Sequence, residues 1–266
     1  MDLPSALNHA SQRMGIQGLK PKQLEVIEAF VSGKDTFVSL PTGYGKSIIF
    51  AMLPLLFDFL FGAQGSIAVV VTPLISLMID QKGKFLQRGL KVEFVGEAQT
   101  DENATMDVLN GDVQLVYISP ESLLLNRGYR NMLTTPTYQQ KLKALVVDEA
   151  HCVKFWGDKF RTAFADIGNI RSLLPKNINV MALTATATKT TLSSVKSRLA
   201  MEDPVIVGLP PDRSNIKMIV EPCPDLSELF EELAKDLREN CTKTTKTVVF
   251  CRSLKDCGKM CKMMKK

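Results

Sequence analysis

The sequence predicts an α/β fold in which helices cover both faces of a parallel β-sheet. Short apolar runs rich in β-branched residues alternate with segments of helical spacing along most of the chain. Ile67–Val71 is an uninterrupted run of the type that is buried on both faces of a parallel sheet. Strands that alternate with helices through short connections imply right-handed crossovers. In such sheets, ligands bind at the carboxyl ends of the strands.

The predicted elements follow one another without an internal repeat. The predicted strands are 36–39, 67–71, 92–95, 113–118, 144–147 and 180–183. The predicted helices are 24–31, 48–61, 74–85 and 192–199, and Ser32-Gly33 and Asp203-Pro204 end the first and the last of them. Pro54 and Asp58 interrupt the apolar stretch 48–61, which is too short to cross a bilayer and is expected to be a buried helix.

Composition agrees with a globular protein. The chain has 266 residues, of which 45% are hydrophobic and 23% charged, with a net charge of +5. That charge permits a polyanion as a partner without requiring one. Residues 1–23 lack the apolar core of a signal peptide, so we do not expect secretion. The six cysteines lack familiar metal-ligand spacings, which favours reduced thiols over a zinc site.

The pattern restarts after Pro210-Pro211. A helix with an apolar stripe is expected over 226–237, and Asp225 with Glu228 resembles a capping box at its start. A strand is expected at 247–251, and Ser253 opens a last helix. Such a segment is too small to close a second α/β core. We therefore expect a first domain over 1–209 and the beginning of a second over 210–266.

The segment Leu40–Ser47 has the composition of a phosphate-binding loop. It lies between a predicted strand and a predicted buried helix. Gly43 and Gly45 let backbone N–H groups surround an oxyanion, and the helix N-terminus adds positive charge. Lys46 can reach the outer phosphates, and the Ser47 hydroxyl can ligate Mg²⁺. The alternative is a glycine turn that merely carries a lysine.

A second candidate site follows the strand at 144–147. Asp148 and Glu149 lie at its carboxyl end, at the same edge as the glycine loop. Asp148 could hold Mg²⁺, and Glu149 could orient or deprotonate the water that attacks the γ-phosphate. An exposed acidic turn is the alternative, but the preceding Gly-x-Gly-Lys-Ser loop makes the pair specific.

These segments and several others resemble the motifs of superfamily 2 helicases of the RecQ type. Gly43–Ser47 resembles motif I and Asp148–His151 motif II, in its Asp-Glu-Ala-His form. The intervening and following matches are Val71–Gln81 with motif Ia, Leu115–Leu123 with the next motif, Ala182–Ala187 with motif III and Val248–Ser253 with motif IV. The resemblance runs in family order from about Gly15 to Cys251.

The resemblance implies a RecA-like ATPase lobe of a 3′–5′ DNA helicase, with a truncated second lobe. ATP and Mg²⁺ are then the cofactors, and single-stranded DNA and duplex junctions the partners, with the nucleus, or otherwise the cytoplasm, as the location. Catalytic roles fall to Lys46, Asp148 and Glu149, and Ser47 and Asp148 hold Mg²⁺. The implied nucleotide-binding residues are Gln23, Thr42, Gly43, Gly45, Lys46 and Ser47.

An aromatic loop directly after His151 carries the most diagnostic match. RecQ enzymes use this loop to couple single-strand DNA binding to ATP hydrolysis. Bases can stack on aromatic faces, and cationic side chains can meet phosphates. The residues with these implied DNA contacts are Phe155, Trp156, Lys159, Phe160 and Arg161. The alternative is that Trp156 and Phe160 are ordinary core residues.

Departures from the family pattern qualify these expectations. Ile16 stands where an aromatic residue often stacks on adenine, and Lys20 where arginine is usual. Motifs V and VI, which would supply an arginine for the transition state, do not occur before Lys266. We therefore expect the chain to bind nucleotide better than it hydrolyses it. A non-catalytic ATP- and DNA-binding module, or an RNA-directed helicase, remains an alternative.

Overall fold

The computed structural model describes residues 2–152, 167–211, 215–220, 222 and 226–264. Contacts between residues divide the chain into two compact units, Met1–Asp212 and Arg213–Lys266. The first unit holds the strands β1 (Thr36–Ser39), β2 (Ile67–Val71), β3 (Val92–Val95), β4 (Leu115–Ile118), β5 (Leu142–Val147), β6 (Asn179–Thr184) and β7 (Val205–Gly208). Its helices are α1 (Leu3–Met14), α2 (Pro21–Val31), α3 (Lys46–Phe61), α4 (Ile75–Leu86), α5 (Glu102–Asn110), α6 (Pro120–Leu125), α7 (Arg127–Thr134), α8 (Pro136–Lys141), the 3₁₀ helix η1 (Ile167–Leu173) and α11 (Lys189–Arg198).

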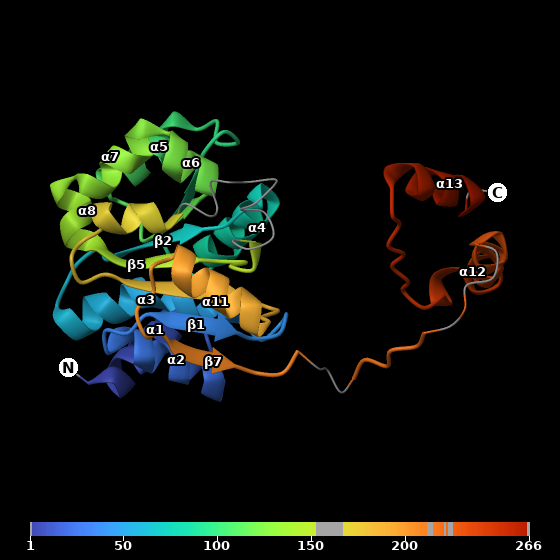
Figure 1. Cartoon of the computed structure of the whole chain (residues 1–266), viewed down its shortest axis with the longest axis horizontal. Helices are drawn as coiled ribbons and strands as arrows, with labels where there is room; N and C mark the ends of the chain where they lie inside the picture. The colour runs from blue at the N-terminus through green and yellow to red at the C-terminus, as the bar shows by residue number, and fades with distance from the viewer. Residues whose placement is uncertain (1, 153–166, 212–214, 221, 223–225, 265–266) are drawn as a thin grey trace. The chain divides into compact units, whose positions relative to one another are not determined.

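The strands form one sheet of seven, in the order β3-β4-β2-β5-β6-β1-β7, and every pair is parallel (Figure 1). The predicted parallel α/β sheet is therefore confirmed. Because all strands run the same way, the segments that follow β1, β2, β4, β5 and β6 meet at one edge. Only β6 separates the end of β1 from the end of β5.

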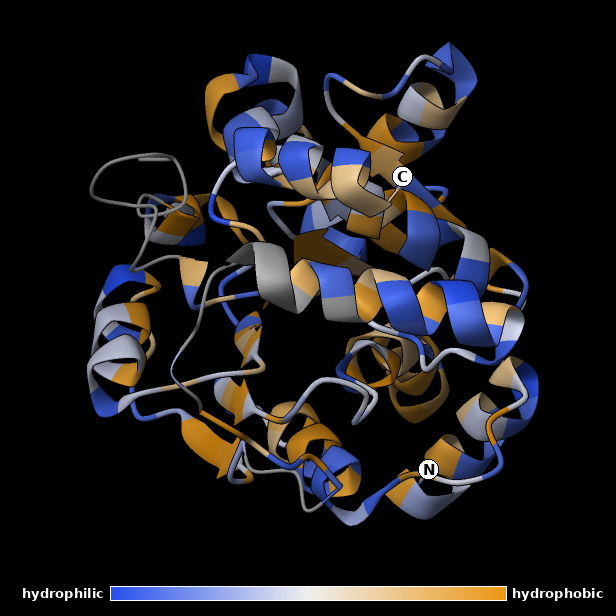
Figure 2. Ribbon diagram, turned by 90° about the vertical axis from the view of Figure 1, so that its right-hand side faces the viewer, coloured by the Kyte–Doolittle hydropathy of each residue, from blue (hydrophilic) through white to orange (hydrophobic). Residues whose placement is uncertain are grey.

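Two hydrophobic cores lie on the two faces of this sheet. Alternate residues of each strand point to opposite faces: in β2, Ala68 and Val70 belong to one core, and Val69 and Val71 to the other. Helices α1–α4 contribute to the first core, and α5–α8, η1 and α11 to the second. The sequence-based expectation of helices on both faces is thus confirmed. Figure 2 shows that most helices carry both hydrophobic and hydrophilic residues, as helices that cover a sheet do.

Helix α3 places the glycine loop against the sheet. It is apolar on almost every side and is buried from Ile49 to Phe57, as the stretch 48–61 predicted. Gly62, at a φ of 62°, ends it. The Asp58 carboxylate accepts the backbone N–H groups of Gly65 and Ser66 at 3.3 and 2.9 Å, which fixes the turn into β2.

Most predicted elements occur where the sequence placed them. The strands 36–39, 67–71 and 92–95 agree residue for residue with β1, β2 and β3, and the other three predicted strands overlap β4, β5 and β6. Helices α1 and α5–α8 and strand β7 were not predicted. Strand β7 pairs with β1 at the edge of the sheet, where Val207 is buried but Ile206 is 52% exposed. Its short run after Asp203-Pro204 therefore lacks the fully apolar pattern of a central strand.

The regular elements that the structure describes in the second unit are helices. It comprises α12 (Leu226–Asn240), the 3₁₀ helix η2 (Cys241–Lys243) and α13 (Leu254–Met264). The two predicted helices are confirmed, and the Ser253 hydroxyl accepts the N–H of Asp256 at 3.1 Å to begin α13. Asp225 and the side chain of Glu228 lie outside the described part.

The predicted strand at 247–251 is wrong. These residues form no strand, and Val248 and Phe250 are 76% and 93% exposed. A strand requires a hydrogen-bonded neighbour, and no other segment described in this unit offers one. The assignment of 210–266 as the start of a second helicase lobe stays a prediction. None of the helices within the described ranges has the length and hydrophobicity needed to span a bilayer.

Candidate nucleotide-binding site

The glycine loop turns between β1 and α3 through two left-handed glycines. Gly43 has a φ of 82° and Gly45 of 94°, angles that residues with a side chain rarely adopt. A Cβ at Gly43 would meet nothing within 4 Å, so the backbone there faces open space. Thr42, also placed by the sequence in the loop, is exposed beside it. Helix α3 begins at Lys46, so that its N-terminal N–H groups lie at the open side of the loop.

Gln23 holds the other side of the loop. It is 3% exposed, and its amide Nε2 donates to the carbonyl oxygens of Tyr44 and Gly45 at 3.2 and 3.0 Å. Its Oε1 accepts the backbone N–H of Lys20 at 2.7 Å, which caps α2. The Lys20 ammonium lies 4.6 Å from the centre of the Tyr44 ring, a cation–π contact. Both ends of the Gln23 amide therefore bind the protein, and α2 is tied to the loop.

Asp148 follows β5 and is 4% exposed. Its backbone N–H donates to the Val71 carbonyl at 2.9 Å, and its Oδ1 accepts the backbone N–H of Glu149 at 3.0 Å. Burial, followed by the neighbouring charge of Glu149, raises the pKa of Asp148 to about 6. Among the described residues no salt bridge reaches this carboxylate. A buried carboxylate without a paired cation suits the binding of a metal ion.

Glu149, the next residue, has a left-handed backbone with a φ of 50°, which is uncommon outside glycine. The Glu149 carboxylate lies 3.2 Å from Nδ1 of His151. The hydrogen bond from His151 lowers the pKa of Glu149, so the carboxylate is ionised at neutral pH. Contacts with the Cys152 sulfur, at 3.6 Å, and with Glu149 raise the pKa of His151.

His151 also joins β5 to β6. Its Nδ1 lies 3.1 Å from the Thr184 hydroxyl oxygen. Because that hydroxyl already donates to the Thr186 carbonyl at 3.0 Å, it accepts from His151, and Nδ1 carries a proton. The backbone N–H of Ala150 donates to the Leu183 carbonyl at 2.8 Å as well. The segments that resemble motifs II and III are therefore connected through side chains and backbone.

The open loop and the buried carboxylate together fit a nucleotide and its metal ion. The Lys46 ammonium donates to the Leu40 carbonyl at 2.9 Å, so it lies at the mouth of the loop. Lys46 also acts on the pKa values of both Asp148 and Glu149, which it lowers. Lysine, serine hydroxyl and carboxylate oxygens are the donors that a phosphate–Mg²⁺ group requires.

A hollow of about 380 Å³ lies further along the same edge. It follows the carboxyl ends of β2, β3 and β4 and is lined by Pro73, Phe94, Gly96 and Ser119, among others. Two of its walls, Pro73 and Ser119, belong to the segments that resemble motif Ia and the motif after it. The carboxyl edge of the sheet thus offers space at β2–β4, with β5 and β6 between this hollow and the end of β1.

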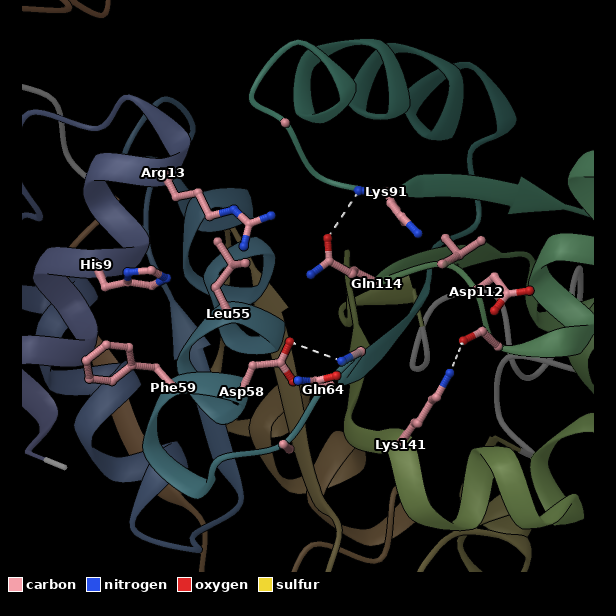
Figure 3. A pocket seen from close by; sticks show the side chains of 15 residues that line it. His9, Arg13, Leu55, Asp58, Phe59, Gln64, Lys91, Asp112, Gln114 and Lys141 are labelled. Atoms are coloured by element: carbon pink, nitrogen blue, oxygen red, sulfur yellow. Dashed lines mark hydrogen bonds between the residues drawn. The ribbon is translucent and has the colours of Figure 1, made fainter.

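A cavity of about 530 Å³ lies at the opposite edge, where β2, β3, β4 and β5 begin (Figure 3). Arg13, Lys91 and Lys141 line it together with Asp58 and Asp112. The lining thus carries charges of both signs, and the cavity contains none of the residues predicted to bind nucleotide or DNA.

The described residues include only part of the predicted site. Residues Phe155, Trp156, Lys159, Phe160 and Arg161 lie outside the described residues, so their contacts with DNA stay a prediction. In the described part, no three His, Cys, Asp or Glu side chains form a group that could hold a metal ion. Thr184 was not singled out from the sequence, although it lies in the segment that resembles motif III.

Two further side chains that sequence analysis did not single out lie behind Asp148. Gln81, on α4, lies close enough to the Asp148 carboxylate to act on its pKa, which it lowers. The Tyr117 hydroxyl, on β4, donates to Oε1 of Gln81 at 2.7 Å. Both residues belong to quoted motif segments, but contacts between residues so far apart in sequence are not visible in the motifs.

Comparison with known proteins agrees with this geometry. The family model described as "DEAD/DEAH box helicase" matches residues 20–195, which is more than half of the chain. The matched range begins at Lys20, ends at Val195 and includes the glycine loop and Asp148–His151.

Curated relatives carry helicase names. The chain is 31% identical to the ATP-dependent helicase SGS1 of Saccharomyces cerevisiae over 91% of its own length and 16% of that protein. It is 34% identical to the ATP-dependent helicase wrn-1 of Caenorhabditis elegans, over 84% of the chain and 20% of the relative. It is 31% identical to the ATP-dependent DNA helicase RecQ of Pasteurella multocida, over 80% of the chain and 32% of that relative. The chain therefore spans less than half the length of these relatives.

A solved structure supports the fold. The crystal structure of the DUF1998 helicase MrfA matches 98% of this chain and 40% of its own, with a TM-score of 0.71 and 18% identity. At that identity the match concerns the fold alone. The family model, the relatives and the arrangement of the glycine loop beside Asp148 and Glu149 lead to the same result: the chain belongs to the DEAD/DEAH box helicase family and is homologous to RecQ helicases.

Proposed function

We propose that this chain is the ATP-binding lobe of a RecQ-type, ATP-dependent 3′–5′ DNA helicase. The observation that carries the proposal is the position of Lys46 and Asp148 at one edge of one sheet, with only β6 between their strands. Lys46 acts electrostatically on both Asp148 and Glu149, so the three charged groups share one site. The homologous proteins are named as ATP-dependent helicases, which agrees with a nucleotide at this edge.

Each side chain then has a defined task. The loop N–H groups, with Thr42, Gly43 and Gly45, surround the phosphates of ATP, and Lys46 donates to the outer phosphates. Ser47 and Asp148 hold Mg²⁺, which when bound neutralises charge on the phosphate oxygens. Gln23 lies next to the loop, where it can exchange its bonds to the Tyr44 and Gly45 carbonyls for bonds to the adenine edge.

Glu149 is the group that orients the attacking water. Its carboxylate is ionised at neutral pH because His151 hydrogen-bonds it, so it can accept a proton from the water in the transition state. Because His151 also contacts Thr184, a movement of the segment 182–187 would reach Glu149 through one imidazole ring. We propose that this connection transmits the state of the nucleotide to the rest of the helicase.

Single-stranded DNA is the proposed substrate of the whole protein. The hollow at the carboxyl ends of β2–β4 lies in the segments that resemble motif Ia and the motif after it. The predicted aromatic loop adds Phe155, Trp156 and Phe160 as stacking surfaces and Lys159 and Arg161 as phosphate contacts. Duplex junctions as preferred DNA and the nucleus as the site of action are part of the same proposal.

Phosphate release by the purified chain tests the proposal. We expect Mg-ATP to bind, and slow phosphate release that single-stranded DNA stimulates and that Glu149→Gln removes. ATP and DNA binding without any turnover would instead support the non-catalytic module. Competition between DNA and RNA oligonucleotides of one sequence tests the substrate: stronger binding of RNA would contradict the DNA assignment. Failure to bind Mg-ATP would contradict both functions.

A further inference from the structure

The cavity at the amino edge of the sheet carries several hydrogen-bond donors. Its volume of about 530 Å³ is typical of small-molecule sites. The last turn of α1 supplies Arg13, whereas Lys91, Gln114 and Lys141 directly precede β3, β4 and β5. Among the described residues, no hydrogen bond or ion pair engages the guanidinium of Arg13 or the ammonium of Lys91. The N–H groups of both cations are therefore available to a ligand.

The Gln114 amide is oriented by the backbone beside it. Its Oε1 accepts the backbone N–H of Lys91 at 3.2 Å, and the backbone N–H of Gln114 donates to the Lys91 carbonyl at 2.9 Å. Because an amide has one acceptor end and one donor end, the bond at Oε1 turns Nε2 the other way. Figure 3 shows Nε2 of Gln114 and the guanidinium of Arg13 pointing into the same space.

Lys141 is fixed in another wall of the cavity. Its ammonium donates to the Gly111 carbonyl at 2.9 Å, and a Cβ at Gly65 would lie 3.7 Å from its Nζ. One bond to a carbonyl leaves further N–H groups of the ammonium for a ligand. The side chain is half-buried, so solvent ions screen its charge less than that of an exposed lysine.

The two carboxylates of the lining do not neutralise these donors. The two oxygens of Asp58 accept the backbone N–H groups of Gly65 and Ser66. Asp112 is exposed, and Figure 3 shows its carboxylate on the far side of the cavity from Arg13. None of the ion pairs in the described part of the chain joins either carboxylate to a cation of the lining. The cavity therefore has an excess of positive charge and of N–H donors.

From this geometry we propose that the cavity binds a small anion that bears phosphate or carboxylate groups, with Arg13, Lys91 and Gln114 as its direct contacts. A guanidinium binds either group through two parallel N–H bonds. The ammonium of Lys141 adds charge from the opposite wall. Oxyanions match this set because they accept hydrogen bonds and carry the opposite charge.

This site is separate from the proposed nucleotide site. Helix α3 begins with Lys46 at the glycine loop and reaches Asp58 at the cavity, about 18 Å along the helix axis. The cavity lies at the amino edge of the sheet and the glycine loop at the carboxyl edge. The inference therefore does not depend on the proposed function.

Calorimetric titrations with inorganic pyrophosphate and, separately, with citrate test the proposal. Because the glycine loop is itself expected to bind phosphate, all variants are compared in a Lys46→Ala background. We expect at least one of the two anions to bind this background at one site. Arg13→Gln should weaken that binding by about 10–100-fold, the effect of losing hydrogen bonds between charged groups. Lys91→Gln should weaken it by about tenfold.

Lys34→Gln is the matched control. Lys34 is an exposed lysine shortly before β1, at the same edge of the sheet but outside the cavity. Its loss removes the same charge and should change the affinity by about twofold or less, since exposed charges are screened. Arg13 and Lys91 are exposed as well, so thermal unfolding should be the same for all three variants.

Each outcome bears on the site. Binding of pyrophosphate alone assigns a phosphate ligand, binding of citrate alone a carboxylate ligand, and binding of both an oxyanion site without preference. The inference is wrong if neither anion binds the Lys46→Ala background, or if Lys34→Gln weakens binding as much as Arg13→Gln. Should Arg13→Gln fail to fold, the comparison of Lys91→Gln with Lys34→Gln decides. The proposed function is tested apart from this, by Mg-ATP binding to the unchanged chain.

Discussion

The amide nitrogen of Gln23 lies 3.0 Å from the carbonyl oxygen of Gly45, and a methyl group at Gly45 would lie 2.6 Å from that nitrogen. A side chain at Gly45 would therefore have to displace the Gln23 amide that holds the loop. The contact joins α2 to the N-terminus of α3, although the two residues lie 22 positions apart.

Gly45→Ala should destabilise the fold by at least about 1–2 kcal/mol, the usual cost of a left-handed backbone with a side chain, and should weaken Mg-ATP binding. Part of the cost arises from the displaced Gln23 amide. Urea unfolding of the two single variants and the double variant with Gln23→Ala checks this. The double variant should be more stable than the sum of the single costs predicts, by about 0.5–3 kcal/mol. Strictly additive losses in the free energy of unfolding would show that the contact between Gln23 and Gly45 does not contribute to stability.

Asp148→Asn should stabilise the chain in the absence of Mg²⁺. The pKa of Asp148 is raised from 3.8 to about 6, so the folded state holds the proton more tightly than the unfolded state. Ionisation therefore reduces the free energy of unfolding as the pH rises from about 4 through about 6, by up to about 3 kcal/mol. Asparagine keeps an oxygen for the N–H of Glu149 but carries no charge.

Unfolding of both proteins in EDTA at several pH values measures this difference. The Asn variant should exceed the unchanged chain most clearly at pH 8, and the difference should disappear near pH 4. A variant that is no more stable at pH 8 would show that the buried charge is compensated in a way that the contacts do not reveal.

Replacing Gly168 and Gly83 by alanine should change the stability of the fold in opposite directions. A Cβ at Gly168, on η1, would clash with the Arg198 carbonyl oxygen, whereas a Cβ at Gly83, on α4, would meet nothing within 4 Å. Gly168→Ala should therefore destabilise the fold by about 1–3 kcal/mol through overpacking. Gly83→Ala should stabilise it by about 0.5–1 kcal/mol, because alanine favours a helix interior. Denaturant midpoints of the two variants give the comparison, and the same sign for both would refute it.

The half-buried ion pair between Arg171 and Asp35 should contribute more to the free energy of unfolding than the exposed ion pair between Lys84 and Asp80. Their atoms lie 2.8 Å apart, the Asp35 side chain is 5% exposed, and its Oδ1 also accepts the N–H of Val180. Arg171→Ala leaves that carboxylate buried and should cost up to about 3 kcal/mol. Lys84 and Asp80 are paired at 2.6 Å but are more than half exposed, so Lys84→Ala should change the stability by less than about 0.5 kcal/mol. Equal losses in unfolding experiments would contradict the role of burial.

The sheet and the candidate site at its edge could be predicted from the sequence because each depends on short runs of consecutive residues. Central strands such as Ile67–Val71 are apolar throughout, and the glycine loop and Asp148-Glu149 each occupy consecutive positions. The edge strand β7 and helix α1 were not predicted, since their apolar residues form weaker patterns. The strand expected at 247–251 has the right residues, but a strand also depends on a neighbour, which no local pattern reveals.

The contacts that refine the site could not be predicted in the same way. Tyr117 and Gln81 lie 36 positions apart, and His151 and Thr184 lie 33 apart. His151 and Thr184 meet because the parallel sheet brings the carboxyl ends of β5 and β6 to one edge, and Tyr117 and Gln81 meet because α4 covers the face of the sheet to which Tyr117 points. Their identity as partners depends on the strand order, which the periodicity of the sequence does not specify.

Calorimetric titration of the purified chain with ATP in the presence of Mg²⁺ tests whether the glycine loop binds the phosphates. We expect saturable binding at one site by the unchanged chain and loss of measurable binding in Lys46→Ala, with both proteins equally folded by circular dichroism. Unchanged affinity in the Lys46→Ala variant would contradict the assignment of the glycine loop as the phosphate-binding site.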